Sequence, residues 1–336
     1  MKYRPEDFGR IIKTNLGSFF VRQKGDSDSI IWIEPGLGGL STEWWKIQNR
    51  LCENATVLCY DRPGYGWSAP TTRSRTPLNV AEEIKSVLDT LQISKPVSFI
   101  AHSLGGLYIR AFMKRYPSLV QSATFLDPMS PMDSAFKEKL SIKEYNGSGI
   151  DKTHLYRTSR LLAQLHIIRF FKKLILNTPP FIYYKDIPDQ SLDILWRNTL
   201  RPTFFTTLLN EYQEAHLESN VHTLMNMQFH FACPVTVLCH DKKVVTEEIN
   251  SHGKLTRESA QRIENIWREL IREYCDLSVN SKLVEIKGAG HYVHINSQEY
   301  LSDLVRNMIS RPLLTAEIVK PNNSIHYIKD SVLVQV

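Results

Sequence analysis

Cysteine is scarce in this sequence, and its spacing does not suggest metal or disulfide chemistry. The 336 residues include five cysteines, and no two of them have Cys-x-x-Cys spacing. An odd number of cysteines without motif spacing is typical of reduced thiols packed in a core. We therefore expect structural thiols in a reducing compartment, and neither a disulfide scaffold nor a zinc site. The five are Cys52, Cys59, Cys233, Cys239 and Cys275.

The sequence also lacks a long uncharged apolar run. The N-terminal residues MKYRPEDFGRIIKT contain no apolar stretch of the kind that a signal peptide needs. The most apolar long stretch, at 161–184, carries Arg169, Lys172 and Lys173 near its middle. Charges are costly in hydrocarbon, so this stretch is not expected to cross a membrane. We expect a soluble, cytoplasmic protein.

Strong charge and phosphate-binding signals are missing as well. The net charge is +6 and the positive residues are spread along the chain, which does not favour a nucleic-acid partner. The G-x-G in YDRPGYGWS (60–68) lacks the third glycine and the Lys-Ser/Thr of a phosphate loop. No His/Cys/Asp cluster has metal-ligand spacing. We expect no cofactor, no metal and no nucleic acid.

Short β-branched runs alternate with helical stripes through most of the chain. Strand–helix alternation predicts an α/β protein with a doubly wound, mostly parallel sheet. Strands are expected at 14–23, 29–36, 55–64, 96–103, 122–128, 233–240 and 281–291, and helices at 78–93, 105–117, 256–274 and 298–309.

The pattern changes after residue 130. Residues 131–230 are helical in character and rich in basic and aromatic residues, which predicts a helical cap inserted into a core formed by 1–130 and 231–310. The basic and aromatic residues at 154–184 allow two interpretations. We favour a solvated cap helix over an apolar acyl pocket, and a peripheral contact with a lipid surface is the alternative. Residues 311–336 are expected to form a C-terminal extension.

Chemically suggestive residues follow four of the predicted strands: Glu34, Ser103, Asp127 and His291. In open α/β sheets ligands gather at the carboxyl ends of the strands. Ser103 stands between a predicted strand and a helix, with Ala101 and Gly105 as small neighbours, and this pattern fits a tight turn that exposes a nucleophile. A plain helix-capping serine is the alternative, and the other strand-end residues make it less favoured.

Several motifs in the same order resemble the α/β-hydrolase family. They are WIEPGLGG (32–39), YDRPGYGWS (60–68), AHSLGGLYIRAFMKRYP (101–117), FLDP (125–128) and GAGHYVHI (288–295), and the resemblance spans about residues 14–310. It implies an α/β-hydrolase fold with Ser103 as nucleophile and His291 as general base. The backbone N–H groups of Leu37 and Leu104 would form the oxyanion hole.

The acid that orients His291 is less clearly indicated. Many relatives place it after the cap, where this chain reads VLCHDKKVV and offers Asp241 a residue or two early. Other members use the end of an earlier strand, where FLDP supplies Asp127. We favour Asp127, and Asp241 stays the alternative.

The resemblance implies a serine hydrolase that cleaves a carboxylic ester, or a related thioester, amide or lipid acyl bond, through an acyl-enzyme. The expected partner is a small-molecule acyl ester or a lipid-like substrate. Acyl transfer and carbon–carbon bond hydrolysis use the same triad and stay open. A ligand-binding receptor with little turnover is the alternative from another class, because the acid after the cap is irregular.

Overall fold

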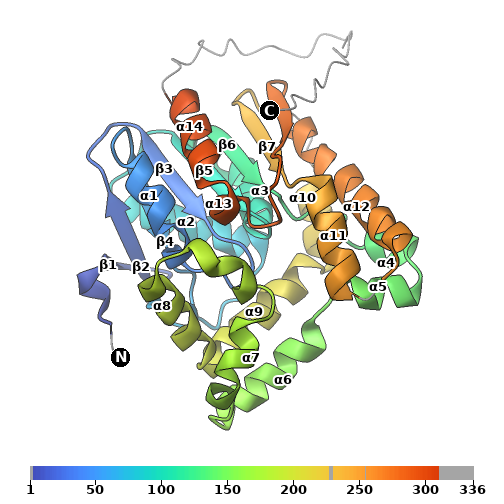
Figure 1. The fold of residues 1–336 in the computed structure, drawn as a ribbon. Helices are drawn as coiled ribbons and strands as arrows, with labels where there is room; N and C mark the ends of the chain where they lie inside the picture. Colours follow the sequence, from blue (N-terminus) through green and yellow to red (C-terminus); the bar gives the residue numbers. More distant parts are fainter. Residues whose placement is uncertain (1–2, 227–229, 254, 310–336) are drawn as a thin grey trace.

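One eight-stranded sheet organises the protein (Figure 1). The computed structural model describes residues 3–226, 230–253 and 255–309, and the predicted extension at 311–336 lies outside them. The spatial order of the strands is β1-β2-β4-β3-β5-β6-β7-β8, parallel from β4 to β8 and antiparallel at β1 and β2. The predicted doubly wound, mostly parallel sheet is confirmed. The strands are β1 (Arg10–Thr14), β2 (Gly17–Lys24), β3 (Ile30–Glu34), β4 (Thr56–Tyr60), β5 (Val97–His102), β6 (Val120–Leu126), β7 (Val235–Cys239) and β8 (Ser281–Glu285).

The strand expected at 14–23 corresponds to β2, and the structure adds β1 before it, which pairs with β2 in a hairpin. β1 ends at Thr14 and β2 begins at Gly17. The Thr14 hydroxyl accepts a hydrogen bond from the backbone N–H of Leu16 at 3.0 Å, which closes a tight turn. Asn15 and Gly17 lie in this turn, and Gly17 has a φ of +147°, a value that favours glycine.

Helices cover both faces of the sheet, as strand alternation requires. Along β5, Phe99 packs with one apolar cluster and Ile100 with the other, since neighbouring residues of a strand face opposite sides. The first cluster includes α2 (Pro77–Thr90) and α3 (Gly105–Arg115), and the second includes α1 (Trp45–Leu51) and α14 (Gln298–Ile309). The remaining helices of the core are α11 (Lys242–Gly253), α12 (Arg257–Ile271) and α13 (Val293–Asn296), with 3₁₀ turns at Pro5–Asp7, Ser41–Trp44, Pro117–Leu119 and Arg272–Leu277. The sequence pattern did not indicate α1 or α11.

A helical insertion connects β6 to β7 (Figure 1). Its first helices pack on α12 of the core through Phe136 and Leu140. Its later helices α8 and α9 pack against loops that follow the strands. The insertion comprises α4 (Ala135–Lys139), α5 (Ile142–Ser148), α6 (Thr153–Gln164), α7 (Lys172–Leu176), α8 (Asp189–Thr199), α9 (Pro202–Ala215) and α10 (Glu218–Met225), with 3₁₀ turns η4 (Ile168–Phe171) and η5 (Phe181–Asp186).

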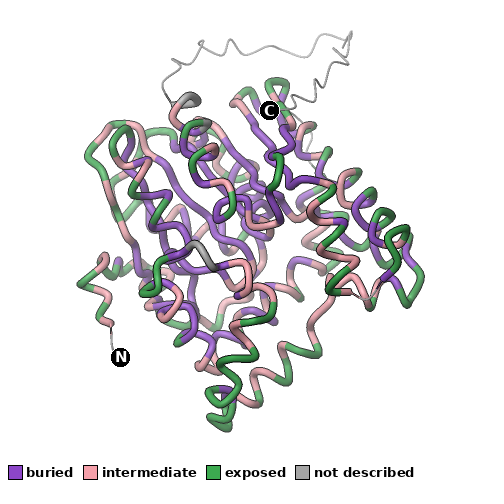
Figure 2. Tube along the Cα trace, in the orientation of Figure 1, coloured by how far each residue is buried: buried purple, intermediate pink, exposed green. Residues whose placement is uncertain are grey.

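The burial pattern separates these two parts. The parallel strands are almost wholly buried, whereas α6 and α7 lie at an end of the molecule with many exposed residues (Figure 2). No helix in the described part of the chain is long and apolar enough to cross a membrane. All five cysteines are free thiols.

Candidate active site

A tight turn between β5 and α3 carries Ser103. Its φ of +49° lies in the left-handed region, which residues with a side chain rarely adopt. The turn is held on both sides, because Ser103 N–H donates to the Leu126 carbonyl at 3.0 Å and its own carbonyl accepts from Met129 N–H at 3.0 Å. Ser103 is partly exposed, while His102 and Leu104 beside it are buried. The backbone therefore presents the serine side chain on a fixed, strained bend.

Small residues let the loop after β3 approach this turn. A Cβ atom added at Gly105 would stand 2.6 Å from the Glu34 carbonyl oxygen and 2.7 Å from that of Pro35. A Cβ atom at Gly36 would stand 3.3 Å from Ser103 Cβ. The loop and the serine turn are thus in direct contact, and glycine is needed on both sides.

Two backbone donors predicted for the oxyanion hole belong to this contact. Leu104 follows Ser103, and Leu37 follows Gly36. Within residues 3–226, 230–253 and 255–309, neither N–H has a protein acceptor. Unpaired backbone donors next to a serine can stabilise a developing negative charge.

Arg62 holds the loop after β3 in place. Its guanidinium is fully buried and donates to the carbonyls of Pro35 at 2.7 Å and Gly36 at 2.6 Å. It also pairs with Glu34 at 3.0 Å and with Glu211 of α9 at 2.6 Å. Burial alone would lower the pKa of Arg62, but these two carboxylates outweigh it and raise that pKa. Arg62 therefore stays charged and connects the loop to the inserted helices.

His291 and Asp127 are joined at the ends of β8 and β6. The Nδ1–H of His291 donates to Asp127 Oδ2 at 2.6 Å, and the carbonyl of His291 accepts from His102 Nε2 at 3.0 Å. Asp127 is buried and has a φ of +45°. Nε2 of His291 and Oγ of Ser103 have no hydrogen-bond partner, including each other, in the part of the chain that the structure describes. Such hydrogen bonds are often long in unliganded enzymes.

A second histidine shares the Asp127 carboxylate. His240 follows β7, and its Nδ1–H donates to Asp127 Oδ2 at 2.7 Å. Its Nε2–H donates to Glu264 Oε2 at 2.8 Å, and Arg268 pairs with Glu264 at 2.6 Å. Burial lowers the pKa of His240, but the charge of Asp127 and the hydrogen bonds to both carboxylates raise it to about 10. His240 is therefore a buried cation at neutral pH.

This cation keeps Asp127 ionised. Burial by itself raises the pKa of Asp127, whereas the charge of His240 and the hydrogen bonds from His240 and His291 hold it well below its ordinary value. Trp267 Nε1–H and the backbone N–H of His240 both reach Oδ1 at 3.3 Å. Both carboxylate oxygens of Asp127 therefore accept hydrogen bonds from protein donors, which favours the ionised form.

Asp241, the alternative acid, is used differently. Its carboxylate accepts backbone N–H bonds from Lys243 at 2.8 Å and Gly288 at 3.0 Å. Burial raises its pKa, and these backbone bonds lower it further than burial raises it. Among the described residues it makes no hydrogen bond to His291. Asp241 therefore caps the start of α11 and holds the loop that leads to His291.

The other two histidines nearby are buried and neutral. His294 stacks on Trp44 with ring centroids 4.1 Å apart, and His102 lies 4.8 Å from the His291 ring. Burial, together with the neighbouring histidines, lowers the pKa of His102, and burial lowers that of His294 to about 3. They pack around His291 without a proton-accepting role of their own.

A family model described as the alpha/beta hydrolase fold matches residues 30–153. Among curated proteins, an AB hydrolase superfamily protein from Gibberella zeae is 24% identical over 294 residues, covering 80% of this chain and 83% of that protein. The chain has the α/β-hydrolase fold. Its predicted fold class is thereby confirmed.

Solved structures of α/β hydrolases share this fold at low sequence identity. An esterase from Exiguobacterium antarcticum is 12% identical with a TM-score of 0.62, covering 90% of this chain and 100% of that one. The epoxide hydrolase CorEH is 14% identical with a TM-score of 0.62, covering 89% and 96%. Identities this low support the fold and leave the reaction open.

The predicted residues Ser103, Leu104, Asp127 and His291 all follow the carboxyl ends of β5, β6 or β8, and the loop that carries Leu37 contacts the serine turn. The sequence analysis did not single out His240. It directly follows β7, and this strand-end position is the sequence signal that could have identified it. Arg62 follows β4 in the same way, whereas nothing in the sequence marks Glu211 within its helix.

Asp127, His240 and His291 also form a group whose ligand-type atoms lie within 4.8 Å of one another, the one such group in the described residues. The two Nδ1–Oδ2 separations are 2.6 and 2.7 Å. Ligands around a tetrahedral zinc ion stand about 3.3 Å apart, since each bond is about 2.0 Å. The spacing fits hydrogen bonds, so a metal ion would have to displace both protons and spread the side chains.

Proposed function

We propose that this protein is a serine hydrolase that cleaves carboxylic esters through an acyl-enzyme. The observation that carries the proposal is Ser103, a partly exposed serine at φ +49° on the turn between β5 and α3. A strained conformation persists where the surrounding structure requires it, and in this fold that turn carries the nucleophile.

The proposed reaction begins when Ser103 Oγ attacks the carbonyl carbon of the ester. Nε2 of His291 accepts the hydroxyl proton as the O–C bond forms, and the N–H groups of Leu37 and Leu104 stabilise the oxyanion. The intermediate collapses, the bond to the alcohol breaks, and the imidazolium gives its proton to the leaving alkoxide. Water then attacks the acyl-enzyme by the same route and releases the carboxylic acid.

Asp127 is the acid that we propose for the triad. Its hydrogen bond fixes Nδ1 of His291 as the protonated nitrogen, which leaves Nε2 free to accept a proton. Because its pKa is held well below the ordinary value, Asp127 is ionised throughout the neutral range and can stabilise the imidazolium.

The surroundings of the loop after β3 favour a substrate with an apolar acyl group. Gly38 touches Phe204 and Leu208 of α9, at distances of 3.3 and 3.1 Å from the position of an added Cβ. Both belong to an apolar cluster that also includes Leu37 and Tyr292. We propose a small-molecule acyl ester or a lipid-like ester as the substrate class. Residue 103 is a serine, whereas epoxide hydrolases and dehalogenases of this family require an aspartate there.

Hydrolysis of a series of p-nitrophenyl esters with increasing acyl length tests this proposal. The wild-type protein should release p-nitrophenol with a preference for one range of lengths, and Ser103→Ala should lower kcat by a factor of about 10³ or more. Equal rates for the two proteins would refute the proposal. Added alcohol that diverts the acyl group into a new ester would instead favour an acyltransferase.

A further inference from the structure

One end of the inserted helices exposes an unusual number of large apolar side chains. Half of those exposed in the described part of the chain lie between Thr153 and Leu176, in α6, η4, α7 and the segment that joins α6 to η4, and Phe170 and Leu174 are 76% and 62% exposed. We call this set the α6–α7 surface; it consists of Leu155, Leu161, Leu165, Ile167, Phe170, Phe171 and Leu174.

These side chains are not the ones that hold the segment to the protein. Ala163 and Ile168 are buried, and Tyr156 and Leu176 are partly buried, in the cluster formed with α9. An amphipathic helix on a protein surface normally has one apolar face, turned inward. This segment has an inward apolar face that packs and an outward apolar set that stays exposed in the part of the chain that the structure describes. Large exposed apolar patches mark interaction surfaces.

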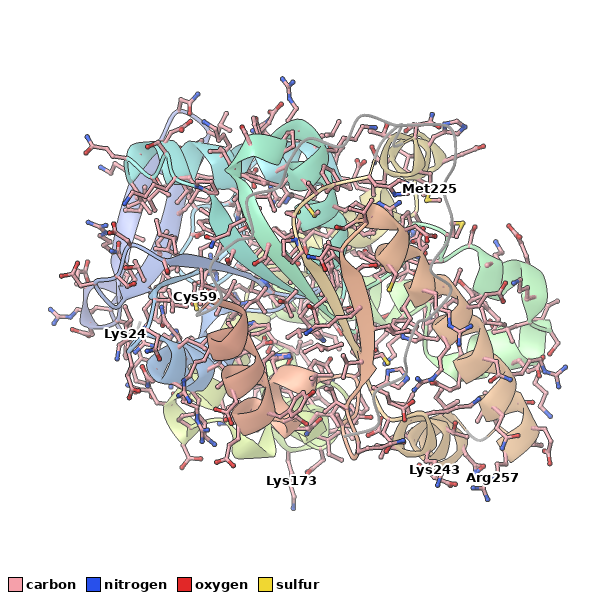
Figure 3. The ribbon with its side chains drawn as sticks, turned by 90° about the horizontal axis from the view of Figure 1, so that it is seen from above. Lys24, Cys59, Lys173, Met225, Lys243 and Arg257 are labelled. Atoms are coloured by element: carbon pink, nitrogen blue, oxygen red, sulfur yellow. The ribbon has the colours of Figure 1, made fainter. Side chains whose placement is uncertain are left out.

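The segment that carries the α6–α7 surface has charges of a single sign. No aspartate or glutamate occurs between Lys152 and Lys185, and the cations in this interval include Arg157, Arg169 and Lys173. Figure 3 shows Lys173 extending away from the body of the molecule. An exposed apolar set on a segment whose own charges are all positive is complementary to an anionic surface with an apolar interior.

We propose that the α6–α7 surface docks the protein onto an anionic lipid bilayer. Phe170, Phe171 and Leu174 would enter the boundary between headgroups and acyl chains, and the neighbouring lysines and arginines would contact lipid phosphates. A second copy of the chain fits less well, because two such surfaces face to face would bring like charges together. The proposal does not rest on Ser103 being a nucleophile.

The same helices connect this surface to the site. α6 packs on α9, and α9 contacts Gly38 through Phe204 and Leu208 and pairs with Arg62 through Glu211. Docking would therefore place the bilayer surface next to the inserted helices, and one of these helices, α9, contacts the loop after β3.

Flotation of the full chain with vesicles tests the proposal. Wild type should float with phosphatidylcholine vesicles that contain about 30% phosphatidylserine and should bind pure phosphatidylcholine at least about tenfold more weakly. Phe170→Ser with Leu174→Ser should weaken binding to the anionic vesicles by about tenfold or more. Ile142→Ser with Val279→Ser, which removes side chains 81% and 79% exposed elsewhere, should bind as wild type does.

The cationic part is tested separately. Lys172→Gln with Lys173→Gln should weaken binding to the anionic vesicles roughly thirtyfold and leave binding to neutral vesicles unchanged. Lys143→Gln with Lys282→Gln, exposed lysines outside the surface, should have at most a small effect. Equal losses in the two pairs would show that net charge alone drives binding and would overturn the proposal.

Hydrogen exchange on the wild-type protein avoids any question of variant folding. Anionic vesicles should slow amide exchange in residues 154–176 and not in the sheet. Absence of binding, or protection elsewhere only, overturns the proposal. So does a dimer in lipid-free solution that the Phe170 and Leu174 substitutions dissociate, because the surface would then serve a second copy of the chain.

Discussion

Replacing His240 by asparagine is expected to move the acid limb of the reaction to higher pH. Asparagine can still donate an N–H toward Asp127, and the backbone N–H of residue 240 still reaches Oδ1. The cation between Asp127 and Glu264 disappears. With this cation gone, a positive charge beside Asp127 is opposed less, so the acid limb of the reaction should move to higher pH.

The size of the shift follows from the separation of the charges. One ring nitrogen of His240 and one of His291 lie within 4.8 Å of each other. At that distance two unit charges interact by about 3 kcal/mol with an effective dielectric constant of about 20. Since one pH unit corresponds to about 1.4 kcal/mol, the acid limb should rise by about 2 pH units. The remaining charges near the pair, Glu264, Arg268 and Glu248, are unchanged by the substitution.

The assay is the second-order rate constant for modification by a fluorophosphonate, measured across the neutral pH range. This rate depends on His291 in its unprotonated form and needs no natural substrate. His216→Asn removes another histidine–carboxylate pair, 3.1 Å long and in the insertion, and should leave the profile unchanged. An acid limb that stays in place or moves to lower pH in His240→Asn would refute the electrostatic reasoning.

Three further predictions use the same residues. Asp127→Asn should lower kcat by about 10⁴-fold in ester hydrolysis and Asp241→Asn less than about tenfold, and the reverse order would transfer the acid role to Asp241. Gly36→Ala, whose Cβ would stand 2.8 Å from His102 Nδ1, should lower kcat and thermal stability together, as kinetics and calorimetry would show. The free energy of unfolding should fall by several kcal/mol as the pH rises from about 6.5 to about 10, because the pKa of His240 is raised in the folded protein; urea titrations that show no loss would contradict this.

The sheet and the serine turn could be predicted because local signals specify them. Short β-branched runs ended by Pro, Gly or Asp mark buried strands, and Ser103 between small residues marks a tight bend. The β1–β2 hairpin was not predicted, because β1 has five residues and buries only Ile12, which gives a weak strand signal. The apolar run at 14–23 indicated one strand there and gave no sign of a second strand before it.

The charged support of the site could not be predicted, since its partners are distant in sequence. His240 pairs with Asp127 and Glu264, 113 and 24 residues away, and Arg62 pairs with Glu211, 149 residues away. Each is an ordinary polar residue until the fold buries it beside an opposite charge. The sequence left open whether residues 154–184 cover an acyl pocket or contact a lipid surface, and which of their apolar side chains are exposed, Phe170 among them, is a property of the folded insertion.

The central claim, that Ser103 is an activated nucleophile, is tested most directly by mass spectrometry after fluorophosphonate treatment. We expect a single adduct on the peptide that contains Ser103, formed within minutes by wild type and absent from Ser103→Ala. A folded wild-type protein that forms no adduct, or one that is modified at another residue while Ser103 stays free, would contradict it.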